Sequence, residues 1–391
     1  MDSSPPADAT TTSAARRPSL LLLTPDYPPA HGGIQLMSLR LAEGMRAFAV
    51  KVLAPGDREA ASFDREHAVA VRRLRGAPGP RGVSNALLNL AAFQEALRLR
   101  PDVVLSLHTV TAPAMAAIGR VLGSETAIVF HAEEITARIK LAAFAARNAD
   151  VSIAVSAYTA GLIEATGARP PRLVRISPGV DSPKDPTPLA ADRPIVVTIA
   201  RLEERYKGHD VMLAALPLVL AKVPDALWVV IGEGSLRPGL ERLARDHGVA
   251  HAVRFLGAVA DEERDEWLRR ARLLAMPSRL PAGGLAGEGF GIAYLEAGAF
   301  GKPALAGDVG GATDAILHGK TGLLVDPRDP LAVAEGITRL LLDTELAGRL
   351  GEAGARRAGE LTWARFAGRV QDTLLEGLAD REGAGGSAGN P

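Results

Sequence analysis

Residues 194–210 read PIVVTIARLEERYKGHD, and this stretch decides the fold. Its first seven residues form a nearly continuous apolar run of the length of one strand. Such a run is typical of a strand that is buried on both faces of a parallel sheet. A charged loop follows, and then a longer apolar segment with the length of a helix. A strand, a loop and a helix in this order form the repeating unit of a doubly wound α/β domain.

The same alternation recurs along most of the chain, because short leucine-rich or β-branched runs alternate with longer amphipathic segments. The expected strands of the first half are SLLLLTP (19–25), FAVKVLAP (48–55), HAVAVRRL (67–74), DVVLSLH (102–108), TAIVFHA (126–132), VSIAVS (151–156) and RLVRISPG (172–179). Those of the second half are PIVVTIA (194–200), LWVVIG (227–232), VRFLG (253–257), LLAMPS (273–278), KPALAG (302–307) and GLLVDP (322–327). The sequence therefore predicts two Rossmann-like, doubly wound domains that face each other across a cleft.

The length of 391 residues exceeds what one hydrophobic core usually supports, which also favours two domains. Five prolines between Pro178 and Pro194 interrupt regular structure and mark the boundary. The predicted parts are a disordered tail (1–17), an N-terminal acceptor-binding domain (18–185), a C-terminal nucleotide-sugar-binding domain (186–365), a helix packing across the junction (366–382) and a second disordered tail (383–391).

Composition excludes several classes of function. The formal net charge is zero, which argues against a nucleic-acid partner held by bulk electrostatics. The chain has no cysteine, so disulfides, thiolate metal sites and a cysteine nucleophile are excluded. No apolar run approaches the roughly 18 residues of a membrane span, and SLLLL after Arg17 is too short for a signal peptide. These features predict a cytoplasmic protein.

Polar side chains follow the expected strands of the second half. Arg201 and Lys207 come after the strand at 194–200, where two cations suit a diphosphate, since Arg binds oxygens bidentately and Lys adds a compact charge. A solvated charged loop is the alternative. Gly232 and Gly234 form a turn after the next strand, but Arg237 stands where the dinucleotide fingerprint has its third glycine, which disfavours an NAD site.

Glycine pairs precede helical segments in both halves, at Gly32 and Gly33 and at Gly310 and Gly311. A glycine lets a ligand approach the backbone N–H groups of a helix N-terminus, where the dipole favours phosphate. Each turn alone is weak evidence. Their equivalent positions in the two halves favour a shared phosphate-bearing ligand.

Two carboxylates flank a further glycine turn in GEGFGIAYLEAGAFGKP, residues 287–303. Glu288 is expected in the loop before a helix that ends near Gly301, and Glu296 about two turns along that helix. Two acids at different depths could accept hydrogen bonds from different hydroxyl groups of a polyol. The alternative is a capping acid and a solvated helix residue.

His131 and His108 follow strands of the first half and could point into the cleft, although a structural hydrogen-bonding role is the alternative for both. No D-x-D pair follows a strand. The H-E-x-x-H, Walker and G-x-S-x-G motifs are also missing from the sequence, so metal, kinase and serine-hydrolase interpretations have no support.

Taken together, IARLEERYKG, VVIGEGS, VRFLGAV, EGFGIAYLEA, GGATD and GKTGLLVDPRDP resemble, in order and spacing, the donor-binding half of the retaining GT-B glycosyltransferases of family 4. This resemblance covers nearly all of residues 195–365. PDYPPAHGGIQ and FHAEE look like the acceptor half of that family. The combination of PDYPPAHGGIQ with AMPSRLPAGGLAGEGFGIAYLEA is most similar to the actinobacterial phosphatidylinositol mannoside mannosyltransferases.

The resemblance implies a role for each matching residue. Arg201 and Lys207 would hold the donor diphosphate, Glu288 the sugar hydroxyls and Glu296 the ribose, while His131 would touch the donor sugar near its anomeric carbon. Further donor-binding positions are Gly33, where the first loop closes on the phosphates, Phe290 and Gly291 through their backbone N–H groups, Gly232, and Gly257 to Val259 around the base. The sequence departs from the family in two places: the Arg201 to Lys207 interval is one residue longer, and Asp314 replaces the usual Glu.

The implied activity is a retaining transfer of a mannose- or glucose-type hexose from a nucleoside diphosphate sugar to a hydroxyl acceptor. The resemblance implies neither a metal nor a cofactor, since the nucleoside diphosphate sugar is a co-substrate. A lipid-linked or cell-envelope acceptor competes with a small natural product. A nucleotide-sugar 2-epimerase and a non-catalytic nucleotide-sugar binder remain as other classes.

Contact with a membrane is a further expectation from charge. Residues 1–185 carry 21 Lys and Arg against 17 Asp and Glu, a balance of +4. This is compatible with peripheral docking on anionic lipid at the inner face of the membrane, with RRLRGAPGPRG (72–82) as one candidate patch. Taken alone, this stretch favours the alternative, which is a solvated basic loop with no membrane contact.

Overall fold

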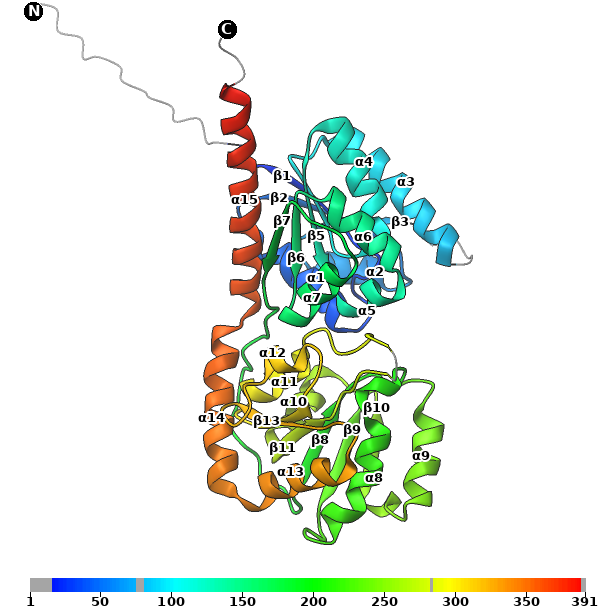
Figure 1. Cartoon of the computed structure of the whole chain (residues 1–391), viewed down its shortest axis with the longest axis vertical. Helices are drawn as coiled ribbons and strands as arrows, with labels where there is room; N and C mark the ends of the chain where they lie inside the picture. The colour runs from blue at the N-terminus through cyan, green and yellow to red at the C-terminus, as the bar shows by residue number, and fades with distance from the viewer. Residues whose placement is uncertain (1–15, 75–80, 282–283, 388–391) are drawn as a thin grey trace, which may run out of the picture.

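A computed structural model describes residues 16–74, 81–281 and 284–387, and shows two α/β domains stacked along the long axis of the molecule (Figure 1). Residues 1–15 and 388–391 of the predicted tails lie outside the described residues, as do residues 75–80 of the basic segment. Residues 383–387, expected as tail, continue the last helix instead.

The N-terminal domain contains a parallel seven-stranded sheet with the order β3-β2-β1-β4-β5-β6-β7. Its strands are β1 (Ser19–Leu23), β2 (Ala49–Pro55), β3 (Ala70–Leu74), β4 (Val103–Ser106), β5 (Glu125–Phe130), β6 (Val151–Ala154) and β7 (Arg172–Arg175). Its helices are α1 (Gly33–Gly44), α2 (Ala60–Glu66), α3 (Arg81–Leu99), α4 (Ala112–Leu122), α5 (Ala132–Ala137), α6 (Ile139–Asn148) and α7 (Ala157–Ala165), with a 3₁₀ turn η1 (Thr109–Thr111).

The C-terminal domain contains a parallel six-stranded sheet with the order β10-β9-β8-β11-β12-β13. Its strands are β8 (Ile195–Ile199), β9 (Leu227–Ile231), β10 (Val253–Gly257), β11 (Leu273–Met276), β12 (Ala304–Gly307) and β13 (Gly322–Val325). Its helices are α8 (His209–Leu220), α9 (Arg237–Asp246), α10 (Asp261–Arg270), α11 (Ile292–Ala299), α12 (Ala312–Ala315), α13 (Pro330–Leu342) and α14 (Thr344–Glu360), with 3₁₀ turns η2 (Arg205–Lys207) and η3 (Ala250–Ala252). The last helix, α15 (Trp363–Ser387), returns to the N-terminal domain.

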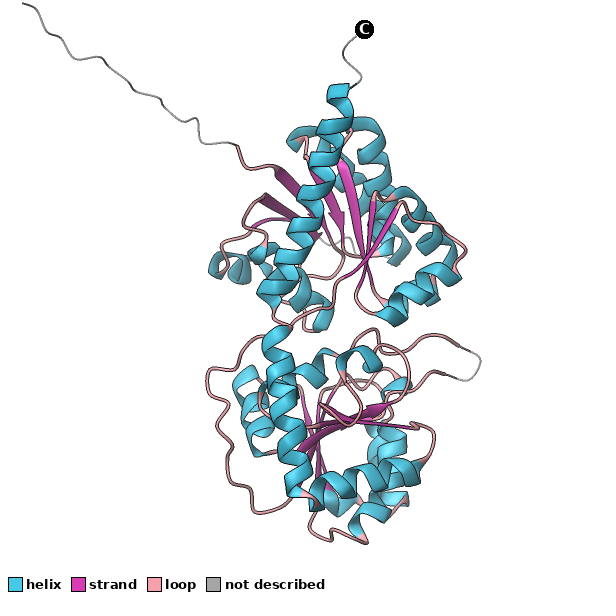
Figure 2. Ribbon diagram, turned by 60° about the vertical axis from the view of Figure 1, so that its left-hand side comes forward, coloured by secondary structure: helices cyan, strands magenta, loops and turns pink. Residues whose placement is uncertain are grey.

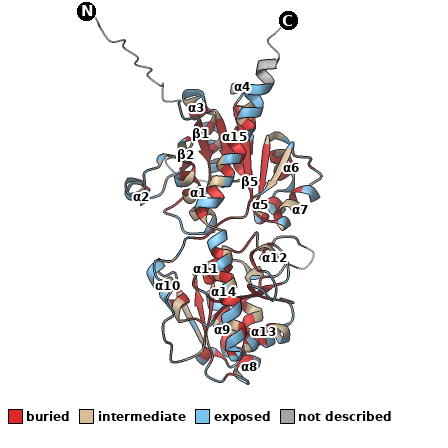
Figure 3. Ribbon diagram, turned by 90° about the vertical axis from the view of Figure 1, so that its left-hand side faces the viewer, coloured by how far each residue is buried: buried red, intermediate tan, exposed pale blue. Residues whose placement is uncertain are grey.

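Burial explains why the apolar runs form these strands. The four leucines of β1, Leu20 to Leu23, are fully buried, because helices cover both faces of the sheet (Figures 2 and 3). Each run expected from the sequence contains a strand, and all of the strand pairs are parallel. The predicted pair of doubly wound domains is therefore confirmed.

Each sheet has one point where the strand order reverses, between β1 and β4 in the first domain and between β8 and β11 in the second. Ligands of doubly wound sheets bind outside the carboxyl ends of the strands at such a point. The loops after these strands face the other domain, as the yellow loop between the two domains in Figure 1 illustrates. The fold therefore directs attention to the residues that follow β1, β4, β8 and β11.

The chain crosses between the domains twice, and the two crossings lie side by side. The Val180 backbone N–H donates to the Leu361 carbonyl at 2.9 Å, where the chain returns to the N-terminal domain. From there α15 packs along α1, and the Gln371 side chain accepts a hydrogen bond of 2.7 Å from the Ala47 backbone N–H. Because α15 belongs to the N-terminal domain by packing, the paired crossings form the covalent hinge.

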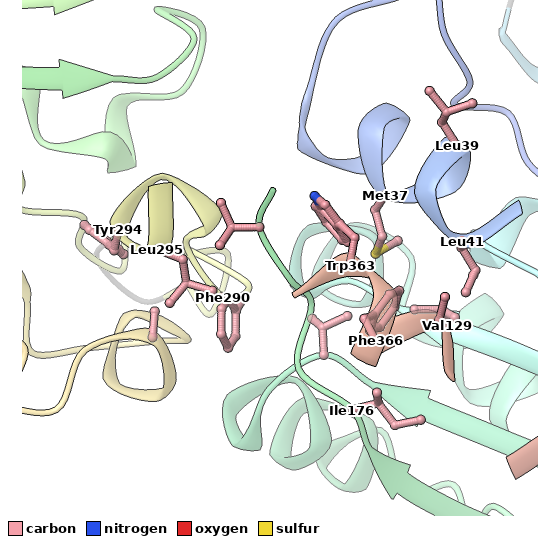
Figure 4. Close-up of a cluster of buried hydrophobic side chains, with 14 of the residues drawn as sticks. Met37, Leu39, Leu41, Val129, Ile176, Phe290, Tyr294, Leu295, Trp363 and Phe366 are labelled. Carbon is pink, nitrogen blue, oxygen red and sulfur yellow. The ribbon is translucent and has the colours of Figure 1, made fainter. Parts of the chain in front are cut away.

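Buried side chains continue from one domain into the other at this hinge. Trp363 and Phe366 pack beside Met37, while Phe290 lies on the side of the C-terminal domain (Figure 4). All four belong to one contiguous apolar cluster, and each is at most 4% exposed. Apolar packing therefore holds the domains together in the arrangement that brings their strand ends face to face.

Candidate active site

A buried ion pair stands at the switch point of the C-terminal sheet. Lys207, in the loop after β8, donates from Nζ to Oε2 of Glu288, in the loop after β11, at 2.6 Å. Their side chains are only 14% and 13% exposed. Burial alone would lower the Lys207 pKa, but the Glu288 carboxylate and the neighbouring Tyr206 raise it, so the ammonium stays charged. Two of the residues selected from the sequence thus meet in one structural unit.

Arg201 lies in the same loop as Lys207, after β8. Its side chain is 59% exposed and donates from Nη2 to Oε1 of Glu204 at 2.6 Å. Burial raises the pKa of Asp26, in the loop after β1, whereas the positive charge of Arg201 acts in the opposite direction. The guanidinium therefore lies within electrostatic reach of the loop after β1 in the N-terminal domain.

The loop that carries Glu288 is fixed by backbone packing against a glycine turn. The Gly311 N–H donates to the Glu288 carbonyl at 2.7 Å. A Cβ on Gly311 would lie 2.0 Å from the Gly289 carbonyl oxygen, so no larger residue fits there without displacing the loop. This contact explains the glycine at position 311 without a ligand.

His131 follows β5 in the opposite domain, at the N-cap of α5. Burial lowers the pKa of its imidazole to about 4, although a hydrogen bond to the Leu107 backbone acts the other way. Its Nε2 is buried and has no hydrogen-bond partner among the described residues. The following residue, Ala132, lies at the loop of Glu288, since a Cβ on Gly289 would be 3.5 Å from the Ala132 nitrogen. His131 is therefore a neutral ring with one unused nitrogen near that loop.

This depressed pKa predicts a pH dependence of stability. Between pH 6.5 and 4 the unfolded His131 binds a proton that the folded ring does not, so the free energy of unfolding falls as the pH is lowered through this window. The slope from one such group approaches about 1.4 kcal/mol per pH unit. Urea unfolding at pH 7, 6 and 5 should show a shallower slope for His131→Gln than for the wild type. Equal slopes would contradict the assigned environment.

Glu134 holds the backbone around His131 and was missed by the sequence analysis. This buried carboxyl accepts hydrogen bonds from the backbone N–H groups of Thr109 at 2.6 Å and His131 at 3.0 Å. It also lies 3.0 Å from Nδ1 of His108. Burial raises the pKa of Glu134 to about 8 and lowers that of His108 to about 3. His108 thus has a structural contact, as in the alternative interpretation of a hydrogen-bonding residue.

Glu296 lies on α11, and its position corrects one expectation. Because α11 begins at Ile292, Glu296 is about one turn into the helix rather than two. Its side chain is 17% exposed and 3.9 Å from Nη1 of Arg264. Burial raises the Glu296 pKa, which Arg264 partly offsets. Glu288 and Glu296 thus lie in different surroundings, one paired closely with a lysine and one beside an arginine.

Two helix N-termini from different domains meet near this loop. Gly33 begins α1 and Ile292 begins α11, and a Cβ on Gly33 would lie 3.4 Å from Cδ1 of Ile292. Gly291, before α11, has φ +93°, a conformation that favours glycine. Phe290 is 3% exposed, so only its backbone could serve a ligand.

The remaining glycines of the predicted set have packing explanations. A Cβ on Gly232 would lie 2.0 Å from the Ala200 carbonyl oxygen, and the Gly232 N–H donates to the Gly257 carbonyl at 2.9 Å. Gly257 adopts φ +79°, and Val259 packs against the apolar cluster. These contacts fix the strand ends of β8, β9 and β10 next to one another, and a donor-binding role for these residues stays a prediction.

Comparison with known proteins identifies the family. The sequence matches the model of Glycosyltransferase Family 4 over residues 31–183 and that of Glycosyl transferases group 1 over residues 181–357. The GDP-mannose-dependent alpha-(1-6)-phosphatidylinositol monomannoside mannosyltransferase of Mycobacterium tuberculosis is 33% identical, covering 91% of this chain and 97% of that protein. The GDP-mannose-dependent monoacylated alpha-(1-6)-phosphatidylinositol monomannoside mannosyltransferase of Corynebacterium glutamicum is 30% identical, covering 93% of this chain and 98% of that protein.

Structural likeness agrees with this result at the level of the fold. A sucrose-phosphate synthase from Thermosynechococcus elongatus superposes with a TM-score of 0.79 at 20% identity, over 93% of this chain and all of that one. Two Rossmann-like domains that meet at their strand ends define the GT-B class of glycosyltransferases. The chain belongs to glycosyltransferase family 4, whose C-terminal half carries the group 1 domain.

Proposed function

We propose that the protein is a retaining, metal-independent hexosyltransferase that transfers a mannose- or glucose-type sugar from a nucleoside diphosphate to a hydroxyl acceptor. The observation that carries this proposal is the buried Lys207–Glu288 pair, placed at the switch point where the two domains meet. An ammonium and a carboxylate held side by side offer one group for a phosphate and one for a sugar hydroxyl. Arg201 and Glu296 extend the same site toward the diphosphate and the ribose.

The proposed roles follow from which atoms remain free. Lys207 uses one N–H on Glu288, which leaves two donors for the diphosphate. The second oxygen of Glu288 can accept from a sugar hydroxyl, and the exposed Arg201 can reach a phosphate oxygen. His131 is neutral, and its buried Nε2, which has no partner among the described residues, can form a hydrogen bond with a further sugar hydroxyl.

The proposed chemistry needs positioned charge more than a dedicated base. The bond from the anomeric carbon to the diphosphate breaks, and the bond to the acceptor oxygen forms on the same face of the sugar. The acceptor proton passes to the departing phosphate oxygen, whose growing negative charge Arg201 and Lys207 stabilise. The site would accelerate the reaction mainly by holding the acceptor and donor in contact.

The relatives indicate which donor and acceptor to test first. The relatives from Mycobacterium tuberculosis and Corynebacterium glutamicum are named as GDP-mannose-dependent enzymes that act on phosphatidylinositol monomannosides, and they match nearly the whole chain. We therefore propose GDP-mannose as the first donor and a lipid-linked polyol as the first acceptor. A small natural product as acceptor is the alternative within the same class.

The surface of α3 supports a lipid-linked acceptor. Leu87, Leu90 and Leu97 on this helix are 44%, 55% and 49% exposed. Glu95, which is the only acid of the helix, is buried and pairs with Lys51 and Arg72. These three groups and Arg98 line a cavity of about 480 Å³.

An exposed face of leucines on a helix that also carries the exposed Arg98 complements an anionic lipid surface better than it complements water. None of the described helices is long and apolar enough to cross a membrane. We therefore propose that α3 rests on the membrane as a peripheral contact.

Vesicle binding tests this contact. Wild-type protein should sediment with vesicles of phosphatidylcholine containing about 30% phosphatidylglycerol, and less with phosphatidylcholine alone, because cations near the surface each add roughly 1 kcal/mol. The double variant Leu90→Glu, Leu97→Glu should lose binding by about tenfold or more. Leu331→Glu with Leu342→Glu, two leucines that are 52% and 61% exposed elsewhere, is the matched control. Equal binding by both variants would contradict the role of α3.

Incubation with GDP, UDP and ADP sugars separates the classes of function. Transfer to an acceptor, or slow release of free sugar, supports the glycosyltransferase. Inversion at C2 of the sugar would support a nucleotide-sugar 2-epimerase, and binding without turnover a non-catalytic binder. The proposal fails if no donor is consumed with any acceptor and Glu296→Ala leaves donor affinity unchanged.

A further inference from the structure

The loop of Glu288 is held from two domains at once. On the side of its own domain, Lys207 binds the Glu288 carboxylate and Gly311 binds its carbonyl. On the other side, three residues at the first turn of α7 contact the C-terminal domain. They belong to the acceptor-binding half, more than a hundred residues earlier in the chain.

One of these contacts comes from Tyr158. Its phenol Oη donates to the carbonyl of Leu285, three residues before Glu288, and burial raises its pKa so that it remains a donor. The ring also lies close to the glycines around the loop, since a Cβ on Gly287 would be 3.8 Å from Oη and one on Gly310 would be 3.8 Å from Cδ1. Tyr158 therefore contacts both backbone segments that shape the position of Glu288.

Two neighbours of Tyr158 support the same contact. Thr159 Oγ1 lies 3.5 Å from the Gly289 carbonyl, on the other side of Glu288. The Ala157 N–H, at the start of α7, donates to Oδ1 of Asp314 at 3.0 Å. A carboxylate from one domain thus caps a helix of the other, at the end where the helix dipole favours negative charge. The loop is contacted before and after Glu288 by the opposite domain.

We infer that Tyr158 is a positioning residue that acts through Glu288, so that the acceptor-binding domain sets how the donor sugar is recognised. This inference rests on the proposed function of Glu288. When the domains separate, the loop loses the bonds from Tyr158 and Thr159 and keeps only those of its own domain. Recognition of the sugar hydroxyls is then complete only when the two domains are together, whereas the diphosphate contacts of Arg201 and Lys207 lie within the C-terminal domain.

Calorimetric titrations with GDP-mannose and with GDP test the inference. Tyr158→Phe removes only the phenolic oxygen, and it should weaken GDP-mannose binding about five- to tenfold while leaving GDP binding unchanged. Glu288→Ala should weaken GDP-mannose binding more strongly. In the double variant, Tyr158→Phe should add nothing to the effect of Glu288→Ala on GDP-mannose, because a residue that acts through another is non-additive with it.

A matched control separates this role from a general loss of structure. Tyr27→Phe removes the same atom from a buried tyrosine of the same domain whose Oη has no partner among the described residues, and it should bind both ligands like the wild type. Wild-type affinity of Tyr158→Phe for GDP-mannose would overturn the inference, as would equal losses for GDP and GDP-mannose or full additivity with Glu288→Ala. If the wild type bound neither ligand, the proposed donor, GDP-mannose, would fall, whereas the Tyr158→Phe pattern is what tests the inference.

Discussion

Lys207→Met is expected to abolish most of the transferase activity, with kcat/KM reduced by about 100- to 1,000-fold. Removing one preorganised donor from a site of developing negative charge typically costs this much. The ammonium of Lys207 is fixed 2.6 Å from Glu288 and is shielded from water, so its charge acts at close range. Steady-state kinetics with saturating acceptor would measure the loss.

The same substitution should also destabilise the fold, and a second change separates the two effects. Lys207→Met leaves Glu288 without its partner at 13% exposure, which should cost about 2 to 4 kcal/mol in the free energy of unfolding. Adding Glu288→Gln should restore most of that stability without restoring activity. Lys222→Met, an exposed lysine after α8, is the control. Recovery of activity in the stable double variant would contradict a catalytic role for Lys207.

Arg201→Ala should lower turnover at least about tenfold, with a smaller loss of stability than Lys207→Met. A charge-assisted hydrogen bond to a phosphate contributes about 1.5 to 3 kcal/mol, so its loss in the transition state is a factor of ten or more. The Arg201 side chain is 59% exposed, so its removal leaves no cavity, but Glu204 is only 16% exposed and loses its partner, so some loss of stability is expected. Kinetics and urea unfolding on the same preparation would show the two effects separately.

Arg205→Ala provides the comparison, because Arg205 is exposed on the same loop and the substitution removes the same charge. It should retain activity close to that of the wild type. If both variants lost activity equally, the effect would come from the overall charge of the loop. If Arg201→Ala kept full turnover, Arg201 would be removed from the site.

The strands could be predicted from the sequence because each is buried on both faces and therefore reads as a continuous apolar run. The loops after them could be selected for the same reason, since a parallel sheet places all its carboxyl ends at one edge. Lys207 and Glu288 were both found in this way. Their direct pairing was not predicted, because it depends on β8 lying next to β11, and these strands are far apart in the sequence.

Other features of the site have no local signal. The hydrogen bond between Tyr158 and the Leu285 carbonyl joins two domains, and no sequence pattern around either residue predicts it. The packing reason for Gly232 was likewise not predicted, because the Ala200 carbonyl that occupies the place of a side chain is brought there by the fold. Glu134 could have been found, because an acid three residues after the strand-end His131 is well placed to bind the first backbone N–H groups of a helix.

The most direct test is to incubate the chelator-treated protein with GDP-mannose and a phosphatidylinositol mannoside acceptor, and to determine the anomeric configuration of the product by NMR. The account predicts transfer that survives excess chelator, an α-linked product from the α-configured donor, and loss of that product in Lys207→Met. A β-linked product, or transfer that occurs only when a divalent metal is restored, would contradict it.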